Sequence, residues 1–198
     1  MKIFSRLINL FFSNKNESND INKINFDYVN FEKKLYSITE IVLKKLIQKV
    51  GLNNIRAFAL STDSDACNLG FYYDTFENYS QNLINPQDDL QYYKYYWTEC
   101  LFDQELLHEF DELETILLDY INEVDFEHVE RKFNIYNLIV NTLYNLKKNR
   151  KFENFSDDFI LMIGVSDDLD ITKEDKIKWV RKLNDDDKFF EFKKYIES

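Results

Sequence analysis

Glycine and proline are scarce in this chain, with three glycines and one proline in 198 residues. Both residue types concentrate in tight turns, so architectures with many hairpins, such as β-sandwiches, are disfavoured and long elements are expected. Hydrophobic residues make up 44% of the chain and aromatic residues 17%, which is more than a disordered chain contains. At this length, we expect one domain with a substantial core.

The clearest secondary-structure pattern lies in the first half of the chain. Apolar residues recur at three- and four-residue steps from Phe31 to Val50, which is typical of a helix, and Gly51 can close it as a C-cap. The run Ile55–Leu60 is apolar apart from Arg56 and predicts a central strand. Turn-forming residues follow it, and Leu69–Tyr73 then alternates as a returning strand. We expect these two strands to pair antiparallel.

Further elements follow in the second half of the chain. The patterns predict an aromatic strand at Gln91–Thr98, one or two helices in the acidic segment, a helix at Val129–Leu146, a strand at Phe159–Val165 and a helical region at Trp179–Ile196. This order of elements favours an α+β fold, a single domain over residues 26–198 with helices packed on a small, mostly antiparallel sheet. Residues 1–25 are expected to form an N-terminal amphipathic segment and a linker.

The N-terminal residues and the cysteines indicate where in the cell the protein is expected. The first 13 residues have an apolar face and two basic residues but no small-residue cleavage site, so we expect a helix that docks on the body; contact with a membrane surface stays open. No apolar run reaches the length of a membrane span. Cys67 and Cys100 have no metal-binding spacing and are expected to be reduced thiols of a cytoplasmic protein.

The negative charge is concentrated between residues 99 and 130, where twelve acids occur without a lysine or arginine. The net charge of the whole chain is −11, so the other residues together carry about +1. Such a segment attracts basic surfaces and repels nucleic acid and anionic lipid. A solvated helix face is one interpretation, and a binding surface for a basic partner is the other. Glu109, Glu112 and Glu123 lie off the apolar stripe and are the candidate contact residues.

An aromatic run precedes the acidic segment. Tyr92, Tyr95 and Trp97 are candidates for an aromatic protein-binding patch, although a strand that is partly core and partly rim also explains them. A stacking platform for bases is disfavoured because such platforms need several basic residues nearby, and Lys94 stands alone.

Two acidic turns could form a metal site. They follow the strands at Ile55–Leu60 and Phe159–Val165, so parallel strands would gather their carboxylates at one sheet edge: Asp63, Asp65, Asp167, Asp168 and Asp170. A hydrolase dependent on a divalent metal is the resulting alternative function. The glycine and closing glutamate of a calcium loop are missing, and aspartate and serine are common in ordinary turns, so we expect no metal site.

No catalytic motif is apparent in the chain. His108 and His128 are the only histidines. His108 is expected to be a solvated helix residue, because the sequence offers no serine or cysteine motif that it could activate. Phosphate-binding loops and zinc motifs are absent from the sequence. We therefore expect no catalytic residues and no cofactor.

Several segments together resemble an uncharacterised bacterial family built on a domain of unknown function. The segments are soft motifs between Phe26 and the chain end: Arg56–Asp65, Leu69–Thr75, Tyr92–Trp97, the helix before Phe152, Phe159–Val165 with its Ser-Asp-Asp, and Lys182–Asn184 with the aromatic helix after it. The resemblance implies an association with polymorphic-toxin loci and an immunity-type role, and supplies no active-site residues.

These observations favour an acidic, non-enzymatic binding protein, and the resemblance implies that it neutralises a basic toxin domain. Nuclease toxins are basic because they hold phosphate backbones, so an acidic inhibitor can occupy the same surface. The metal-dependent hydrolase and a structural or regulatory interaction module stay open as alternatives, and the oligomeric state is not determined by the sequence.

Overall fold

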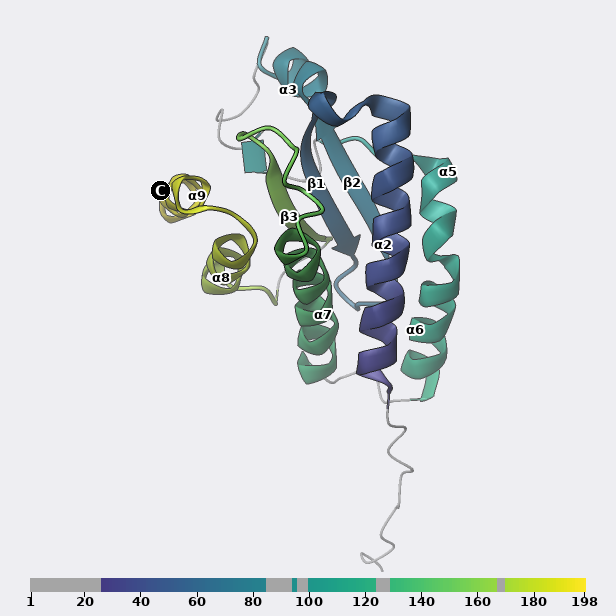
Figure 1. Ribbon diagram of the computed structural model, residues 1–198. Coiled ribbons are helices and arrows are strands. Elements are labelled where there is room, and N and C mark those ends of the chain that lie inside the picture. Colours follow the sequence, from purple (N-terminus) through teal and green to yellow (C-terminus); the bar gives the residue numbers. More distant parts are fainter. Residues whose placement is uncertain (1–25, 85–93, 96–99, 124–128, 167–169) are drawn as a thin grey trace, which may run out of the picture.

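The computed structural model describes residues 26–84, 94–95, 100–123, 129–166 and 170–198. These residues form an α+β domain around a three-stranded sheet with the strand order β2-β1-β3 (Figure 1). The central strand β1 (Ile55–Thr62) pairs antiparallel with β2 (Gly70–Thr75) and parallel with β3 (Ile160–Val165). The predicted α+β class and the antiparallel hairpin are confirmed, and the sheet is mixed, with one pairing of each kind.

Strand β1 is buried along its whole length. Alternate side chains of a strand point to opposite faces, so Phe58 and Leu60 enter the main core while Ala57 and Ala59 face a second, smaller cluster. Burial on both faces explains why the strand reads as a continuous apolar run.

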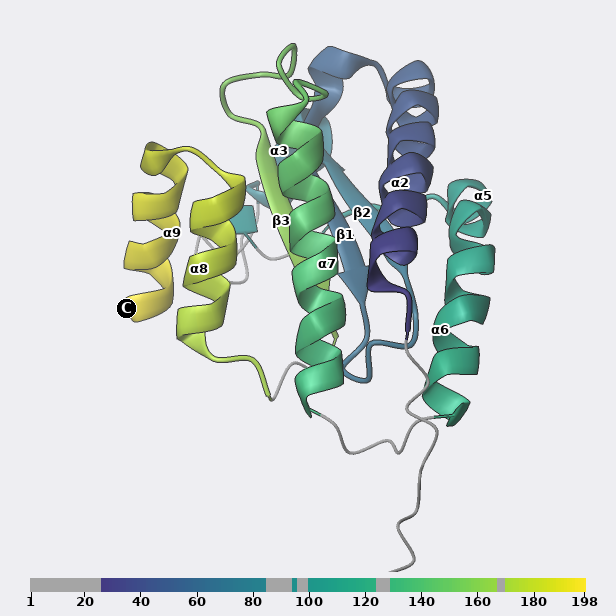
Figure 2. The same cartoon turned by 60° about the horizontal axis from the view of Figure 1, so that its bottom comes forward.

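From left to right, the helices lie in the order α9, α8, α7, α2, α6 in both views (Figures 1 and 2). The main core is covered by α2 (Tyr28–Val50), α7 (Val129–Lys148) and the acidic helices, which are α5 (Gln104–Leu107), the 3-10 turn η3 (His108–Phe110) and α6 (Asp111–Glu123). Asp27 caps α2 by accepting from the Asn30 N–H, and Gly51 closes it at φ 90°, a conformation that favours glycine. The predicted C-cap is therefore confirmed.

The two C-terminal helices, α8 and α9, pack against β3 and contribute to the second cluster. In α8 (Lys173–Leu183), Trp179 and Leu183 reach the main core while Val180 joins the second cluster, so this helix lies beside the edge of the sheet. The last helix, α9 (Asp186–Glu197), adds Phe192 to the second cluster. Two short elements complete the fold, the 3-10 turn η1 (Leu52–Asn54) and the helix α3 (Phe76–Asn82).

Both edges of the sheet have a non-strand partner at one point. The Asn184 side chain accepts from the Leu161 N–H at 2.9 Å and donates to the Leu161 carbonyl at 2.8 Å, as a neighbouring strand would. On the opposite edge, Leu101 exchanges two backbone hydrogen bonds with Tyr73 of β2.

One predicted strand is wrong where the structure describes it. Lys94 and Tyr95, from the run expected to form a strand at Gln91–Thr98, are helical. The other residues of that run lie outside the described residues. The predicted N-terminal segment at residues 1–25 also lies outside them. Among the helices that are described, none is long and apolar enough to cross a membrane.

Candidate functional site

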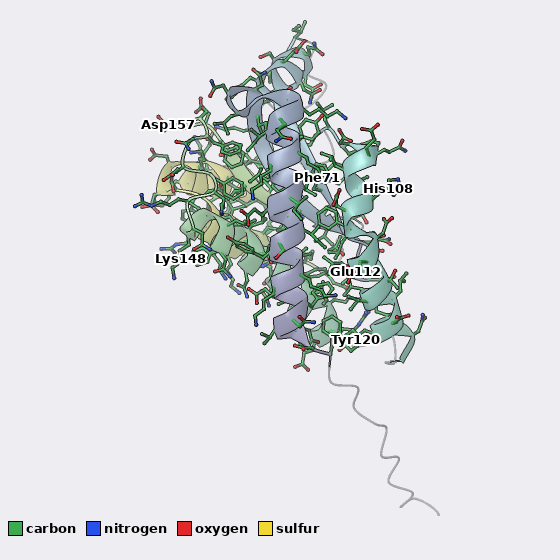
Figure 3. All side chains as sticks on the ribbon, turned by 45° about the vertical axis from the view of Figure 1, so that its right-hand side comes forward. Phe71, His108, Glu112, Tyr120, Lys148 and Asp157 are labelled. Carbon is green, nitrogen blue, oxygen red and sulfur yellow. The ribbon has the colours of Figure 1, made fainter. Side chains whose placement is uncertain are left out.

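The acidic helices lie alongside α2 and bury one side in the main core (Figure 3). The predicted apolar stripe is confirmed, because Leu106, Phe110, Leu113 and Leu117 are all buried. Tyr120 continues the stripe, and its hydroxyl lies 3.1 Å from the Tyr28 hydroxyl. Burial and this hydrogen bond raise the pKa of Tyr120 to about 12, so it stays neutral at physiological pH.

Lysines of α2 form ion pairs with three acids of the acidic segment. Lys34 pairs with Glu112, Lys45 pairs with Glu109, and Lys49 pairs with Asp103. The three lysines are spaced by eleven and four residues, which places them on one face of α2. Part of the acidic segment therefore has its counter-charges on another helix. The spacing of these lysines was the signal in the sequence that could have revealed this.

Asp103 is the most constrained of the paired acids. Its buried carboxylate caps α5 by accepting from the backbone N–H groups of Glu105 at 3.1 Å and Leu106 at 3.3 Å. The hydrogen bond from Lys49, together with these backbone donors, lowers the pKa of Asp103. The same contact raises the pKa of Lys49. Asp103 is therefore a structural anchor between α2 and α5.

Glu114 also has a structural contact, because it accepts from the Leu69 N–H at 2.9 Å and ties the hairpin to α6. The acids of α5 and α6 that are exposed to solvent make up a set that we name the outer acidic strip: Glu105, Asp111, Glu112 and Asp119. The Glu112 side chain is 68% exposed despite its pair with Lys34. The exposed Leu118 lies next to Asp119 and adds apolar surface to the same helix.

The sequence candidates for partner contact thus have different environments. Glu112 is part of the outer acidic strip, whereas Glu109 is less exposed, at 29%, and pairs with Lys45. Glu123 is the last residue of α6.

The aromatic candidate Tyr95 lies inside the fold. It is 6% exposed and packs edge-to-face on Phe192 of α9, with ring centroids 5.3 Å apart. Its hydroxyl donates to a carboxylate oxygen of Glu191 at 2.9 Å. Burial is the main cause that raises the pKa of Tyr95 well above its ordinary value, and the hydrogen bond to Glu191 is the second cause. Tyr92 and Trp97 lie outside the described residues.

The described residues of the two acidic turns come together at one edge of the sheet, beyond the carboxyl ends of the parallel strands β1 and β3. Asp63 stabilises its own turn by accepting from the Cys67 N–H at 2.7 Å and from the Asn68 side chain at 2.6 Å. Asp65 and Asp170 both pair with Lys132 of α7, at 3.2 and 3.6 Å. Within the described ranges, no group of three or more histidine, cysteine or acidic residues is arranged to hold a metal ion. Asp167 and Asp168 lie outside those ranges.

Sequence reasoning missed the basic and tyrosine side chains of α7 that hold the first acidic turn. The buried Arg131 donates from Nη2 to the Asp65 carbonyl at 3.1 Å, and Tyr136 donates to the Ser64 carbonyl at 2.9 Å. With Lys132, these contacts fix the turn against the helix. The described carboxylates at this edge therefore make turn and ion-pair contacts.

A comparison with known families gives one match. The model of a domain of unknown function, DUF4303, matches residues 35–185. The chain belongs to the DUF4303 family. The matched range of DUF4303 begins within α2 and ends just after α8, so it contains all three strands, the acidic helices and Asn184. Comparisons with curated proteins and with solved structures find no match.

Proposed function

We propose that this protein is a non-enzymatic binding protein whose outer acidic strip receives a basic protein partner. The observation behind the proposal is the sorting of the acids on α5 and α6. Three acids pair with α2 lysines, while Asp111 and Asp119 are exposed on helices that have no basic residue other than His108, which pairs with Asp111.

The α2 lysines change what the strip can contribute. Three ion pairs remove part of the local negative field, so the net field comes mainly from the acids without a lysine partner. Glu105 adds to it, because it shares Lys49 with Asp103, at 3.6 Å. Exposed charges of this kind add little affinity each, but they accelerate the encounter with a surface of opposite charge. Leu118 gives a partner an apolar contact between the acids.

A basic toxin domain fits this surface. Nucleases present cationic surfaces to phosphate backbones, and an acidic face that covers such a surface would block the substrate. The resemblance to proteins of polymorphic-toxin loci supports an immunity role inside a bacterial cytoplasm, and this role is part of the proposal.

The test identifies a basic partner by pull-down from the native cell and then measures its association rate by stopped flow. In the double variant Asp111→Lys/Asp119→Lys, the association rate at low salt should fall about tenfold, and the difference should shrink as salt screens the charges. Circular dichroism checks that the variant is folded.

A matched control separates the strip from the total charge. Asp157→Lys/Asp158→Lys makes the same change in net charge at exposed positions, and Figure 3 shows Asp157 on the other side of α2 from His108 and Glu112. The control should retain most of the wild-type rate. Equal rates for the strip variant and the wild type, or an equal loss in both variants, would refute the role of the strip.

A further inference from the structure

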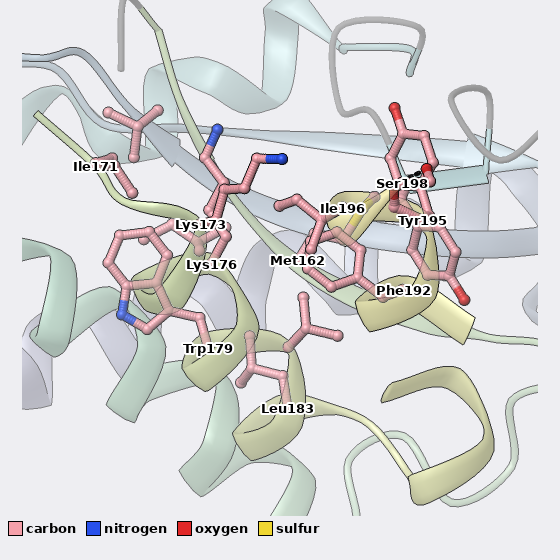
Figure 4. A pocket seen from close by; sticks show the side chains of 14 residues that line it. Met162, Ile171, Lys173, Lys176, Trp179, Leu183, Phe192, Tyr195, Ile196 and Ser198 are labelled. Carbon is pink, nitrogen blue, oxygen red and sulfur yellow. Dashed lines mark hydrogen bonds between the residues drawn. The ribbon is translucent and has the colours of Figure 1, made fainter. Parts of the chain in front are cut away.

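A cavity of about 320 Å³ lies between β3, α8 and α9 (Figure 4). Its walls are mainly apolar and come from Met162, Trp179, Val180, Leu183, Phe192 and Ile196. It lies on the far side of α7 from the outer acidic strip, so it is independent of the function proposed above (Figures 1 and 2). Protein interiors are close-packed, and an apolar cavity of this size is typical of a ligand site.

Two lysines give the cavity a polar end. Lys173 and Lys176 line it from the first turns of α8, and their spacing of three residues places them on one face of that helix. Figure 4 shows both side chains extending in the same direction, away from Leu183. Within the part of the chain that the structure describes, Lys173 is not in an ion pair, whereas Lys176 has another contact and Lys178 pairs with Asp175. Lys173 is therefore the main counter-charge at this end, and Lys176 adds a second positive charge beside it.

The size of the cavity limits the ligand. A water molecule has a share of about 30 Å³ in the liquid, so the cavity has room for a molecule of about ten non-hydrogen atoms. An apolar body with one negative end matches the apolar walls and the two ammonium groups. A neutral or cationic molecule would use only the walls.

We infer that this cavity binds a small amphipathic carboxylate, such as a medium-chain fatty acid. The hydrocarbon chain lies against Met162, Val180 and Phe192, and the carboxylate lies between Lys173 and Lys176. The ion pairs orient the ligand with its chain inward, since the carboxylate at the lysine end keeps access to water.

The first experiment is calorimetric titration of the full chain with octanoate, octanol and octyltrimethylammonium. Octanoate should bind with one-to-one stoichiometry and at least tenfold more tightly than octanol, and the cation should bind weakest. Absence of octanoate binding, or equal affinity for octanoate and octanol, would overturn the inference.

Variants then locate the site. Lys173→Gln/Lys176→Gln should weaken octanoate binding about tenfold and leave octanol binding unchanged, while the matched control Lys178→Gln should behave as the wild type. Ile196→Trp should fill the cavity and abolish binding of both molecules. Retention of octanoate binding in either the double lysine variant or Ile196→Trp would refute this location.

A spectroscopic readout tests the location while the described lining residues stay unchanged. The chain has two tryptophans, so Trp97→Phe leaves Trp179 as the single tryptophan, and its emission should shift as octanoate binds. Sedimentation measures whether the protein is a monomer or a dimer. A dimer that is dissociated by Ile196→Glu and does not bind octanoate would show that a second copy covers the cavity instead, and would overturn the inference.

Discussion

Replacement of Asp74 by alanine should destabilise the fold by about 3–5 kcal/mol, because it leaves a buried arginine without its counter-ion. Arg56 and Asp74 have side chains that are each 3% exposed, and the guanidinium donates to one Asp74 oxygen from Nε at 2.7 Å and from Nη2 at 2.6 Å. The other Asp74 oxygen accepts from the Thr75 N–H at 2.9 Å and the Asn78 side chain at 2.7 Å. The Arg56 guanidinium also lies over the Tyr79 ring, 4.2 Å from its centroid.

The magnitude follows from burial. When one partner of a buried ion pair is removed, the remaining charge loses its compensation, whereas removal of both partners in favour of apolar side chains is often nearly neutral. Arg56→Met/Asp74→Leu should therefore cost less than Asp74→Ala alone. The exposed pair of Lys34 and Glu112 provides the control, and Lys34→Ala should cost less than about 1 kcal/mol.

Urea unfolding followed by circular dichroism measures these free energies, with the midpoint and the slope fitted together. The double-mutant cycle over Arg56 and Asp74 isolates their coupling. A loss below about 1 kcal/mol in Asp74→Ala, or costs of the two single substitutions that simply add in the double variant, would refute the assignment of a compensated buried pair.

Three further predictions concern the anchors and the acidic turns. Asp103→Ala should lower the free energy of unfolding by about 1–2 kcal/mol near neutral pH, because the helix cap is lost. The pKa of Asp103 is lowered in the folded state, so its stabilisation is present above the unfolded pKa of about 3.9 and is lost as the pH falls through the folded pKa. The stabilities of variant and wild type, measured by urea unfolding, should therefore converge in acid and not at high pH. Asn184→Ala should cost about 1–2 kcal/mol and accelerate hydrogen exchange at the Leu161 amide, and an unchanged exchange rate would contradict the edge contact. Millimolar Mg²⁺, Ca²⁺ or Mn²⁺ should leave the Tm unchanged, whereas a rise of several degrees would indicate a bound ion and favour the metal-dependent hydrolase.

Local patterns in the sequence predicted most of the elements. The helix closed by Gly51, the strand over Ile55–Leu60 and the apolar stripe from Leu106 to Leu117 depend on neighbours within a few turns or strand positions, and the structure confirms them. Lys94 and Tyr95 show the limit of this approach. Aromatic residues favour strands only where they can pack against neighbouring strands of a sheet. The Tyr95 ring packs against α9 instead.

The contacts of the candidate site depend on chain segments that are distant in sequence. Glu109 and Glu112 find their lysines 64 and 78 residues earlier, so a search for ion pairs within the acidic segment could not find them. The parallel pairing of β1 with β3 likewise joins strands about a hundred residues apart. The apolar cavity has no local pattern either, because its walls come from a strand and two later helices.

Asn184 gives the family boundary a physical meaning. The DUF4303 match ends at residue 185, one position after the side chain that pairs with the backbone of Leu161. An unpaired strand edge is a template for association with other chains. A fragment that ended before Asn184 would retain every strand yet leave the Leu161 amide and carbonyl open to a neighbouring molecule, so this asparagine would act as a barrier to aggregation as well as a fold contact.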